Sequence, residues 1–346
     1  MVKYLKGSLH NHTTCSDGQA SPEEAAKIYK SLGYDFIIYT DHDTNFPVEE
    51  YIKEPMEDFT YISGAEFGFR FKNHFNNNAD VHLCGIGYVG DYIPPRESSF
   101  AYETISQIIR EYYRLGAIPQ VNHPNWGGSR RGYSFNYTEL LNVNYPYLLE
   151  IVNYSDGGHN EGNEAFESVE YIWDVLLSNG KTVYGTMTDD THIYFGKKPW
   201  IENSFSDIVD QWANDAREIL RKGHTPGNGF VMVKVDTDNN LKDNILSSLR
   251  CGDFYASNGL YADFYEVRVK YIKIKVKPQN GENNRIIFKG RMGLPLKIVD
   301  GDEAVYEFTG SPDEQYIRVK AINGAGKCAL FQPVFNDGRN KLLINK

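Results

Sequence analysis

Six of the nine histidines in this chain lie at or just after the ends of expected strands, or close to another residue that can bind metal. The first two form the sequence His10-Asn11-His12, and on an extended chain they point to the same side because side chains alternate. Imidazole and carboxylate groups together suit divalent manganese, iron or zinc. The candidate metal ligands, six histidines and three acids, are His10, His12, Asp17, His42, Glu66, His82, His123, Asp190 and His192.

An isolated histidine, or a single His-X-His pair, is more often an ordinary surface or core feature than a metal ligand. If the nine residues able to bind metal were ordinary surface or core residues, the position of each at a strand end would need a separate explanation. The set as a whole therefore favours a metal centre. The other three histidines, His74, His159 and His224, lack this context and are predicted to be loop residues.

The first half of the chain alternates apolar extended segments with helical ones. Ser21-Pro22-Glu23-Glu24 predicts a helix start, with an N-cap, a proline and two acids in the first turn, and Gly33 ends that helix. Further helices are expected near 100–115 and 162–178. Strands are expected at 4–10, 36–40, 61–67, 80–88, 117–124, 148–153 and 182–188. This alternation favours a parallel α/β barrel, in which the carboxyl ends of the strands meet on one face.

The second half has a different pattern. Residues 197–227 are interpreted as an insertion, after which a strand at 230–236 and a helix at 241–252 are expected. From residue 263 onwards apolar and polar residues alternate with a period of two, which is typical of antiparallel strands. We therefore expect a barrel domain over 1–262 and a small β-sandwich-like domain over 263–346. The second domain has no histidine and is expected to supply no metal ligand.

Length and composition exclude several classes of protein. The chain has 346 residues, of which 41% are hydrophobic and 24% charged, so a disordered chain is excluded. No apolar run approaches the ~20 residues that cross a membrane, and the N-terminus lacks a signal-peptide pattern. The net charge of −10 argues against a stable nucleic-acid partner. Four scattered cysteines without a CxxC pair are typical of reduced thiols, which indicates a cytoplasmic protein. The oligomeric state stays open.

The segments that carry the candidate ligands resemble the PHP (polymerase and histidinol phosphatase) superfamily of metal-dependent phosphoesterases. The matching pieces are HNHTTCSDG with the following PEEAAKIYKSLGYDFIIYTDHD, then GAEF, VHLCGIGY, NHP and TDDTH, over about residues 7–192. The later segments are similar to a stand-alone branch that includes enzymes resembling carbamate hydrolases. The resemblance implies a distorted (β/α)7 barrel, related to the TIM barrel, that holds two or three metal ions.

The resemblance also implies how the ligands divide among the ions. His10, His12, Glu66 and Asp190 would hold the first ion. Glu66 would bridge to a second ion, which His82 and His123 would also hold. Asp17, His42 and His192 would complete a trinuclear centre, although Asp17 stands where some relatives carry histidine.

Three divalent ions would bring six positive charges, and Asp17, Glu66 and Asp190 would return three negative ones, which favours an anionic substrate. A hydroxide that bridges two metals is the expected nucleophile. Asp190 is expected to orient or deprotonate the water, with His192 or Asp17 near the leaving group. Asp41 and Asp189 are expected to hydrogen-bond imidazoles from outside the metal shell.

The substrate is harder to predict than the chemistry. Arg130 and Arg131 are candidates for gripping a phosphate, as are Lys197 and Lys198, although solvated surface charge is the more common state of such residues. Asn153 is expected to line the pocket.

Three hypotheses remain for the function. The first is a phosphoesterase that cleaves a mono- or diester of a small phosphorylated metabolite or nucleotide, with inorganic phosphate as product. The second is a hydrolase of a carboxyl ester, amide or carbamate that uses the same polynuclear centre. The third, a metal-binding module without activity, is disfavoured by the complete set of nine ligands. No polymerase segments accompany the PHP-like region, so a proofreading role is not expected.

Overall fold

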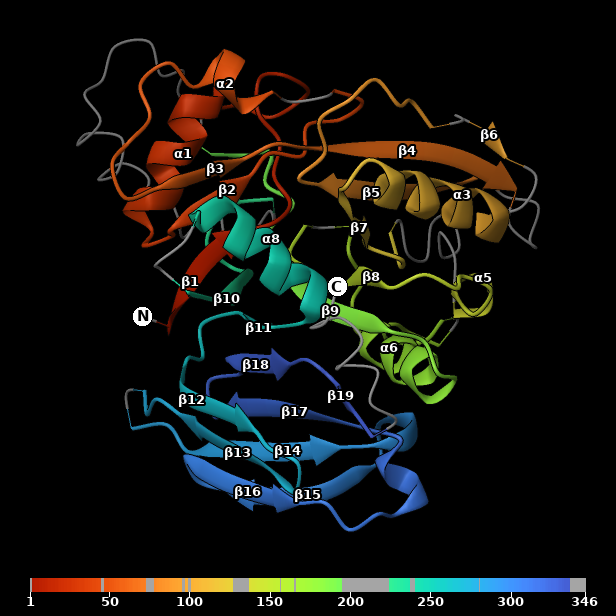
Figure 1. Ribbon diagram of the computed structural model, residues 1–346, viewed down its shortest axis with the longest axis vertical. Helices are drawn as coiled ribbons and strands as arrows, with labels where there is room; N and C mark the ends of the chain where they lie inside the picture. Colours follow the sequence, from red (N-terminus) through yellow and green to blue (C-terminus); the bar gives the residue numbers. More distant parts are fainter. Residues whose placement is uncertain are drawn as a thin grey trace.

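The chain is a mixed α/β protein whose described strands form three sheets (Figure 1). The computed structural model describes residues 2–44, 47–72, 78–94, 97–98, 101–126, 137–155, 157–164, 166–194, 224–236, 240–279 and 281–336. Within these ranges, no helix is both long enough and apolar enough to span a membrane.

The largest sheet runs through the whole molecule in the order β15-β14-β17-β18-β11-β10-β1-β2-β3. Strands β1, β2 and β3 are parallel, and β10 and β11 add to β1 in antiparallel fashion. Its strands are β1 (Val2–Ser8), β2 (Phe36–Ile38), β3 (Thr60–Ile62), β10 (Phe230–Asp236), β11 (Phe254–Ser257), β14 (Asn284–Lys289), β15 (Pro295–Asp300), β17 (Tyr316–Asn323) and β18 (Cys328–Phe331), with β19 (Val334–Phe335) paired to β17.

Two further sheets complete the fold. The six-stranded sheet contains β6 (Glu97–Ser98), β4 (Gly64–Lys72), β5 (Asn78–Ile86), β7 (Ile118–Val121), β8 (Tyr147–Asn153) and β9 (Val183–Thr188), in that spatial order. The three-stranded sheet contains β12 (Ala262–Val267), β13 (Tyr271–Val276) and β16 (Glu303–Glu307). In Figure 1 the blue C-terminal strands form a layer below the rest of the molecule.

A seven-stranded parallel barrel was expected, but the described strands form open sheets and no closed barrel. Strand β5 is antiparallel to both β4 and β7, and the ends of the two large sheets meet at the isolated bridges Asn11–Thr191 and His42–Glu66. The physical reason for the reversal is the connection between β4 and β5, which has only residues 73–77. A parallel connection needs a dozen or more residues, whereas a short one makes a hairpin.

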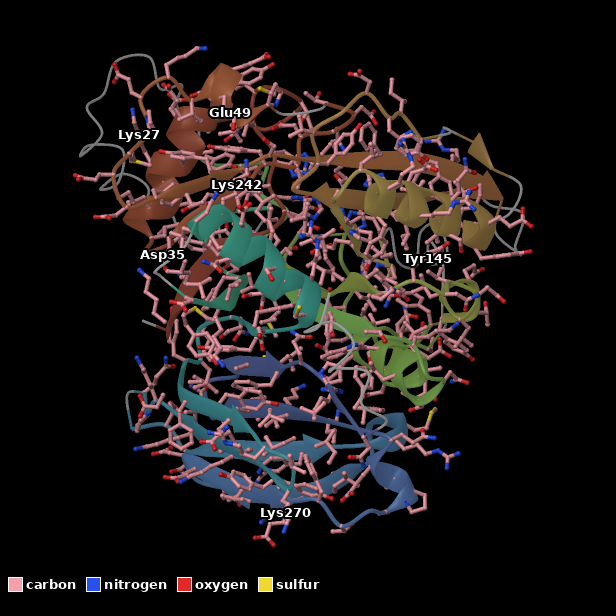
Figure 2. The ribbon with its side chains drawn as sticks, viewed as in Figure 1. Lys27, Asp35, Glu49, Tyr145, Lys242 and Lys270 are labelled. Carbon is pink, nitrogen blue, oxygen red and sulfur yellow. The ribbon has the colours of Figure 1, made fainter. Side chains whose placement is uncertain are left out.

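Helices cover the sheets where the sequence predicts them, with shifted ends. The predicted start at Ser21 is confirmed, because Glu24 N–H donates to Ser21 Oγ and Ser21 N–H donates to Glu24 Oε2. Lys242 at the start of α8 reaches to 3.9 Å from Glu49 of α2, and Figure 2 labels both. The helices are α1 (Pro22–Ser31), α2 (Val48–Tyr51), α3 (Ala101–Arg114), α5 (Tyr137–Leu140), α6 (Val169–Ser178), α8 (Leu241–Cys251) and the 3-10 turns η1 (Arg291–Gly293) and η2 (Pro312–Glu314).

The C-terminal strands join the rest of the chain in two ways. Strand β18 pairs with β11, so one sheet crosses the predicted boundary after residue 262. Arg318 of β17 is fully buried, and its guanidinium donates to Asp174 and Glu170 of α6 at 2.6–2.8 Å. The division into two domains stays a prediction. Most of the predicted 197–227 insertion lies outside the described residues.

Candidate metal centre

The ends of the strands bring the predicted ligands to one place. Asp17 lies in the loop after His12, and the other eight lie on strands or directly after them. These eight are His10 and His12 after β1, His42 after β2, Glu66 in β4, His82 in β5, His123 after β7, and Asp190 and His192 after β9.

The centre of the cluster is the carboxylate of Glu66, whose side chain is 1% exposed. Oxygen Oε2 lies 3.3 Å from His12 Nε2 and 3.0 Å from His42 Nδ1. Near the other oxygen, Oε1, lie His10 Nε2 at 3.3 Å, His82 Nδ1 at 3.3 Å and His123 Nε2 at 3.5 Å. Five imidazoles therefore surround this one carboxylate.

A second buried acid, Asp190, closes the inner part of the cluster. Its Oδ1 lies 3.3 Å from His10 Nε2 and 3.1 Å from His12 Nε2. The same oxygen lies 3.6 Å from His192 Nδ1. The structure thus brings together His10, His12, Glu66 and Asp190, which the resemblance assigns to one ion.

The outer part of the cluster surrounds Asp17, whose side chain is 56% exposed. Its carboxylate lies 3.4 Å from His192 Nε2 and 3.9 Å from His42 Nε2. His12 Nδ1 also faces it, at 3.7 Å, so His12 stands between the inner and outer groups. The compact groups that the described residues form are His10–His12–Glu66, His42–Glu66–His82 and His12–Asp17–His42–His192. The resemblance places His123, rather than His42, beside Glu66 and His82.

These side chains fit divalent metal ions. His10 Nδ1 must be the donor to Glu150 Oε1, at 2.6 Å, because a carboxylate only accepts. In the neutral ring this directs the lone pair of Nε2 at the carboxylates of Glu66 and Asp190. Glu66 Oε2, His12 Nδ1 and His82 Nδ1 are buried without a hydrogen bond. Converging lone pairs of this kind repel one another unless a cation lies between them, and nitrogen and carboxylate oxygen suit Mn, Fe or Zn.

The pKa shifts of Glu66 and His10 favour positive charge beside Glu66, whereas that of His12 favours a neutral ring. Burial alone would raise the pKa of Glu66, but His10, His82 and His42 outweigh burial and hold it well below its ordinary value. Burial lowers the pKa of His12 to about 4, so this imidazole is neutral and able to act as a ligand. Burial also opposes a charge on His10, yet the nearby carboxylates, led by Asp190, raise its pKa well above normal.

The sequence analysis missed Glu150, which is fully buried in β8. Besides holding His10, its carboxylate accepts hydrogen bonds from Thr188 Oγ1 at 2.7 Å and from the backbone N–H of His123 at 2.9 Å. Asn153 Nδ2 donates to Glu150 Oε2 and to Asp190 Oδ2, at 3.0 and 3.2 Å. The signal was an acid in the otherwise apolar segment LLEIVN, because a buried carboxylate needs partners.

Asp41 and Asp189, which were expected to hydrogen-bond imidazoles, accept hydrogen bonds from loop residues instead. Asp41 accepts from the backbone N–H and hydroxyl of Thr13 and from the Ser16 hydroxyl. Asp189 accepts from three consecutive backbone N–H groups at 227–229. Both acids order loops, and Glu150 is the acid that holds an imidazole.

The remaining candidates divide between the site and the undescribed segments. Asn153 is buried behind the inner cluster, where it connects two acids. His224, predicted to be a loop residue, packs against His192. Outside the described residues lie the phosphate-gripping candidates Arg130, Arg131, Lys197 and Lys198, together with His74.

Comparison with known proteins finds similar solved structures and one matching family model. Three similar solved structures are distant, and none of the three reaches a TM-score of 0.5. A Bacteroides vulgatus two-domain protein, predicted to contain a PHP-like metal-dependent phosphoesterase, is 13% identical, with 96% of this chain and 95% of that chain covered and a TM-score of 0.44. A Bifidobacterium adolescentis protein assigned as a metal-dependent phosphoesterase is 14% identical (63% and 96% covered, TM-score 0.36). A Chromobacterium violaceum amidohydrolase is 13% identical (54% and 87% covered, TM-score 0.35).

The sequence comparisons are more decisive. No curated protein matches the chain significantly. The PHP domain family model matches residues 8–214, which is more than half of the chain and includes every member of the cluster around Glu66 and Asp190. This chain belongs to the PHP domain family.

Proposed function

We propose that this protein is a metal-dependent hydrolase that cleaves phosphate mono- or diesters of a small metabolite or nucleotide. The observation that carries the proposal is the convergence of five imidazoles on the buried carboxylate of Glu66, with Asp190 beside it. Two or three divalent ions, of Mn, Fe or Zn, would lower the pKa of a water molecule and stabilise charge on phosphoryl oxygens.

The side chains that would hold these ions form an inner and an outer set. The inner set is His10, His12, Glu66 and Asp190, with His82 and His123 on the other side of Glu66. The outer set is Asp17, His42 and His192. Of the inner residues, His10, His12, Glu66 and Asp190 are 0–3% exposed, whereas His42 is 30% and Asp17 56% exposed. The substrate is therefore expected to approach from the outer side.

Residues of this chain position the reacting groups. Asn153 holds Asp190 Oδ2, so that Oδ1 faces the cluster and can orient the attacking water or take its proton. His192 Nδ1 donates to the backbone carbonyl of Asp190 at 2.9 Å, which directs His192 Nε2 at Asp17 and the open side. His192 and Asp17 are thus the groups we propose near the leaving oxygen.

Glu150 changes the charge of the centre. It is a fourth acid at the centre; burial alone would raise its pKa, but His10 outweighs burial and lowers the pKa below its ordinary value. With three divalent ions the excess falls from about three positive charges to about two, which still favours an anionic substrate. The smaller excess of positive charge is also compatible with a second candidate function, the hydrolysis of a neutral carboxyl ester, amide or carbamate.

A side-by-side kinetic comparison on one metal-loaded preparation separates the two. Phosphate esters should exceed aryl esters and carbamates by at least about 10-fold in kcat/KM, which needs only ~1.4 kcal/mol of differential transition-state binding. Inorganic phosphate should inhibit competitively. Faster hydrolysis of an aryl carbamate than of every phosphate ester, without phosphate inhibition, would favour the second candidate.

A further inference from the structure

Six side-chain rings form a closed circuit of neighbouring ring contacts at the candidate metal centre. Four of them, from His42, His82, His123 and His192, are predicted metal ligands, whereas Trp126 and His224 are not. The ring-centroid distances around the circuit are 5.4 Å (His42–His82), 5.1 Å (His82–His123), 4.6 Å (His123–Trp126), 6.1 Å (Trp126–His224), 5.1 Å (His224–His192) and 6.1 Å (His192–His42).

His224 is fixed to the turn that carries two of the ligands. Its Nδ1 donates to the backbone carbonyl of Asp190 at 3.3 Å, and its own carbonyl accepts from the N–H groups of His192 and Ile193, both at 3.0 Å. Its backbone has a φ of 62°, an uncommon conformation for a residue with a side chain. These contacts hold the imidazole, half-buried, edge-on to His192.

Trp126 is half-buried and contacts both His123 and Gly157. Its backbone N–H donates to the carbonyl of His123 at 2.9 Å, and its ring packs on the His123 ring. The indole also lies against Gly157, where an added Cβ would come within 2.8 Å of the indole carbons. The indole is thus positioned by the fold before any substrate arrives.

We propose that Trp126 and His224 form an aromatic wall against which a planar ring of the substrate packs, next to the scissile ester. The proposal rests on the proposed function and narrows its substrate class to phosphate esters whose organic group carries a flat aromatic ring. The indole of Trp126 has no group suited to bind a metal ion, and it lies beside the ring of the candidate ligand His123. Aromatic rings prefer offset or edge-to-face contacts with other rings, and the two rings of the wall, inclined by 69°, offer both.

A pair of non-hydrolysable ligands tests the wall without any turnover. Benzylphosphonate and cyclohexylmethylphosphonate share the phosphonate group and similar size, and differ in the flat ring. Calorimetry on the manganese-loaded full chain should show about fivefold tighter binding of benzylphosphonate, the size expected of one aromatic contact. Equal affinity of the two compounds for the wild-type protein would overturn the proposal.

Variants assign the preference to this wall. Trp126→Leu and His224→Leu should each bring the two affinities closer together, and Trp126→Phe should retain most of the preference. Gly157→Ala should weaken it by displacing the indole. Tyr145→Leu is the matched control, because Tyr145, labelled in Figure 2, is an exposed aromatic residue that precedes β8. A preference that survives both leucine variants would refute the assignment.

Two further measurements keep this proposal separate from the proposed function. Metal content is measured for each variant. If Trp126→Leu loses metal ions, the proposed wall is judged instead from the two ligand affinities of the wild-type protein and of Gly157→Ala. Hydrolysis of benzyl phosphate and cyclohexylmethyl phosphate is then compared. A Trp126-dependent binding preference without hydrolysis of either ester would contradict the phosphoesterase and leave the wall standing. Equal hydrolysis of the two esters together with equal binding of the two phosphonates would support the phosphoesterase and contradict the aromatic wall.

Discussion

Glu66 is the residue whose two oxygens face the largest number of imidazole nitrogens. Glu66→Gln keeps the shape but replaces one oxygen by an amide N–H₂, which cannot bind a cation. We expect the metal content to fall and kcat/KM to drop about 100-fold or more, as when comparable electrostatic groups are removed. Elemental analysis and steady-state kinetics measure both. Glu49→Gln, on the exposed surface of α2, is the control and should change neither. Full metal content in Glu66→Gln would contradict the proposed ligand set.

Glu150 holds His10, and we expect it to affect metal binding through that imidazole. Glu150→Gln should let the His10 ring turn or change tautomer, because the amide no longer demands a proton from Nδ1. We expect metal affinity to fall about 10- to 100-fold, the usual effect of losing such a partner. Competition with a chelator measures the affinity, and a double variant with His10→Ala shows whether the two residues act together. If the losses from the two single variants simply add, Glu150 has a role independent of His10.

The sequence predicted the residues of this site better than their partners. Each candidate ligand stands beside a second group able to bind metal or at a strand end, as His10 does, and the sequence shows this pattern directly. The role of Glu150 was not recognisable, because its hydrogen bonds reach β1, β7 and β9, and such neighbours depend on tertiary folding. The same reason applies to Asp41, where only the fold shows that Thr13 and Ser16 lie in reach.

At the scale of elements, the sequence located strands and helices but not all of their directions. The Ser21–Glu24 capping pattern is local, so it identified the start of α1 correctly. The antiparallel placement of β5 depends on which strands it joins, and an apolar strand has the same composition in either direction. The short 73–77 connection was the available signal for the hairpin.

We expect the contact of α6 with β14 and β17 to depend on pH through Glu170. Its carboxylate lies 2.8 Å from Arg318 Nη2 and 2.6 Å from Lys320 Nζ. Burial alone would raise the pKa of Glu170, but Arg318 and the two nearby lysines outweigh burial and lower it well below its ordinary value of 4.5. A carboxyl group with a lowered pKa stabilises the fold fully above the unfolded-state pKa, and this contribution disappears as the pH falls through the folded-state pKa.

Glu170→Gln should therefore cost about 2 kcal/mol of unfolding free energy at pH 7, the value of hydrogen bonds to charged groups. The difference from wild type should shrink as the pH is lowered below 4.5. Urea unfolding between pH 3 and pH 7 measures this. Glu303→Gln, at an exposed pair with Lys273, is the control and should have a much smaller effect. A pH-independent difference would exclude Glu170 as the titrating group.

At the scale of the whole molecule, one sheet continues from β3 to β15 across the predicted domain boundary. The backbone pairs Tyr255–Phe331 and Ser257–Ala329 join β11 to β18, and the buried Arg318 joins β17 to α6. Separating the two parts would expose a sheet edge and leave Asp174 with an unpaired buried charge. Both consequences are unfavourable, so the two parts are expected to open together.

We therefore predict a single cooperative unfolding unit. Native-state hydrogen exchange followed by mass spectrometry should assign the same opening free energy to the slowest amides of β8 and of β17. Arg318→Met should lower both values equally, by about 3–5 kcal/mol, because it removes the buried guanidinium that pairs with Asp174 and Glu170 of α6. Arg285→Met, at an exposed pair with Asp300, should lower neither by more than about 1 kcal/mol. If β17 opened at a lower free energy than β8, or if Arg318→Met weakened β17 alone, the C-terminal strands would be an independent folding unit. The shared sheet would then be a contact between two domains and not a common core.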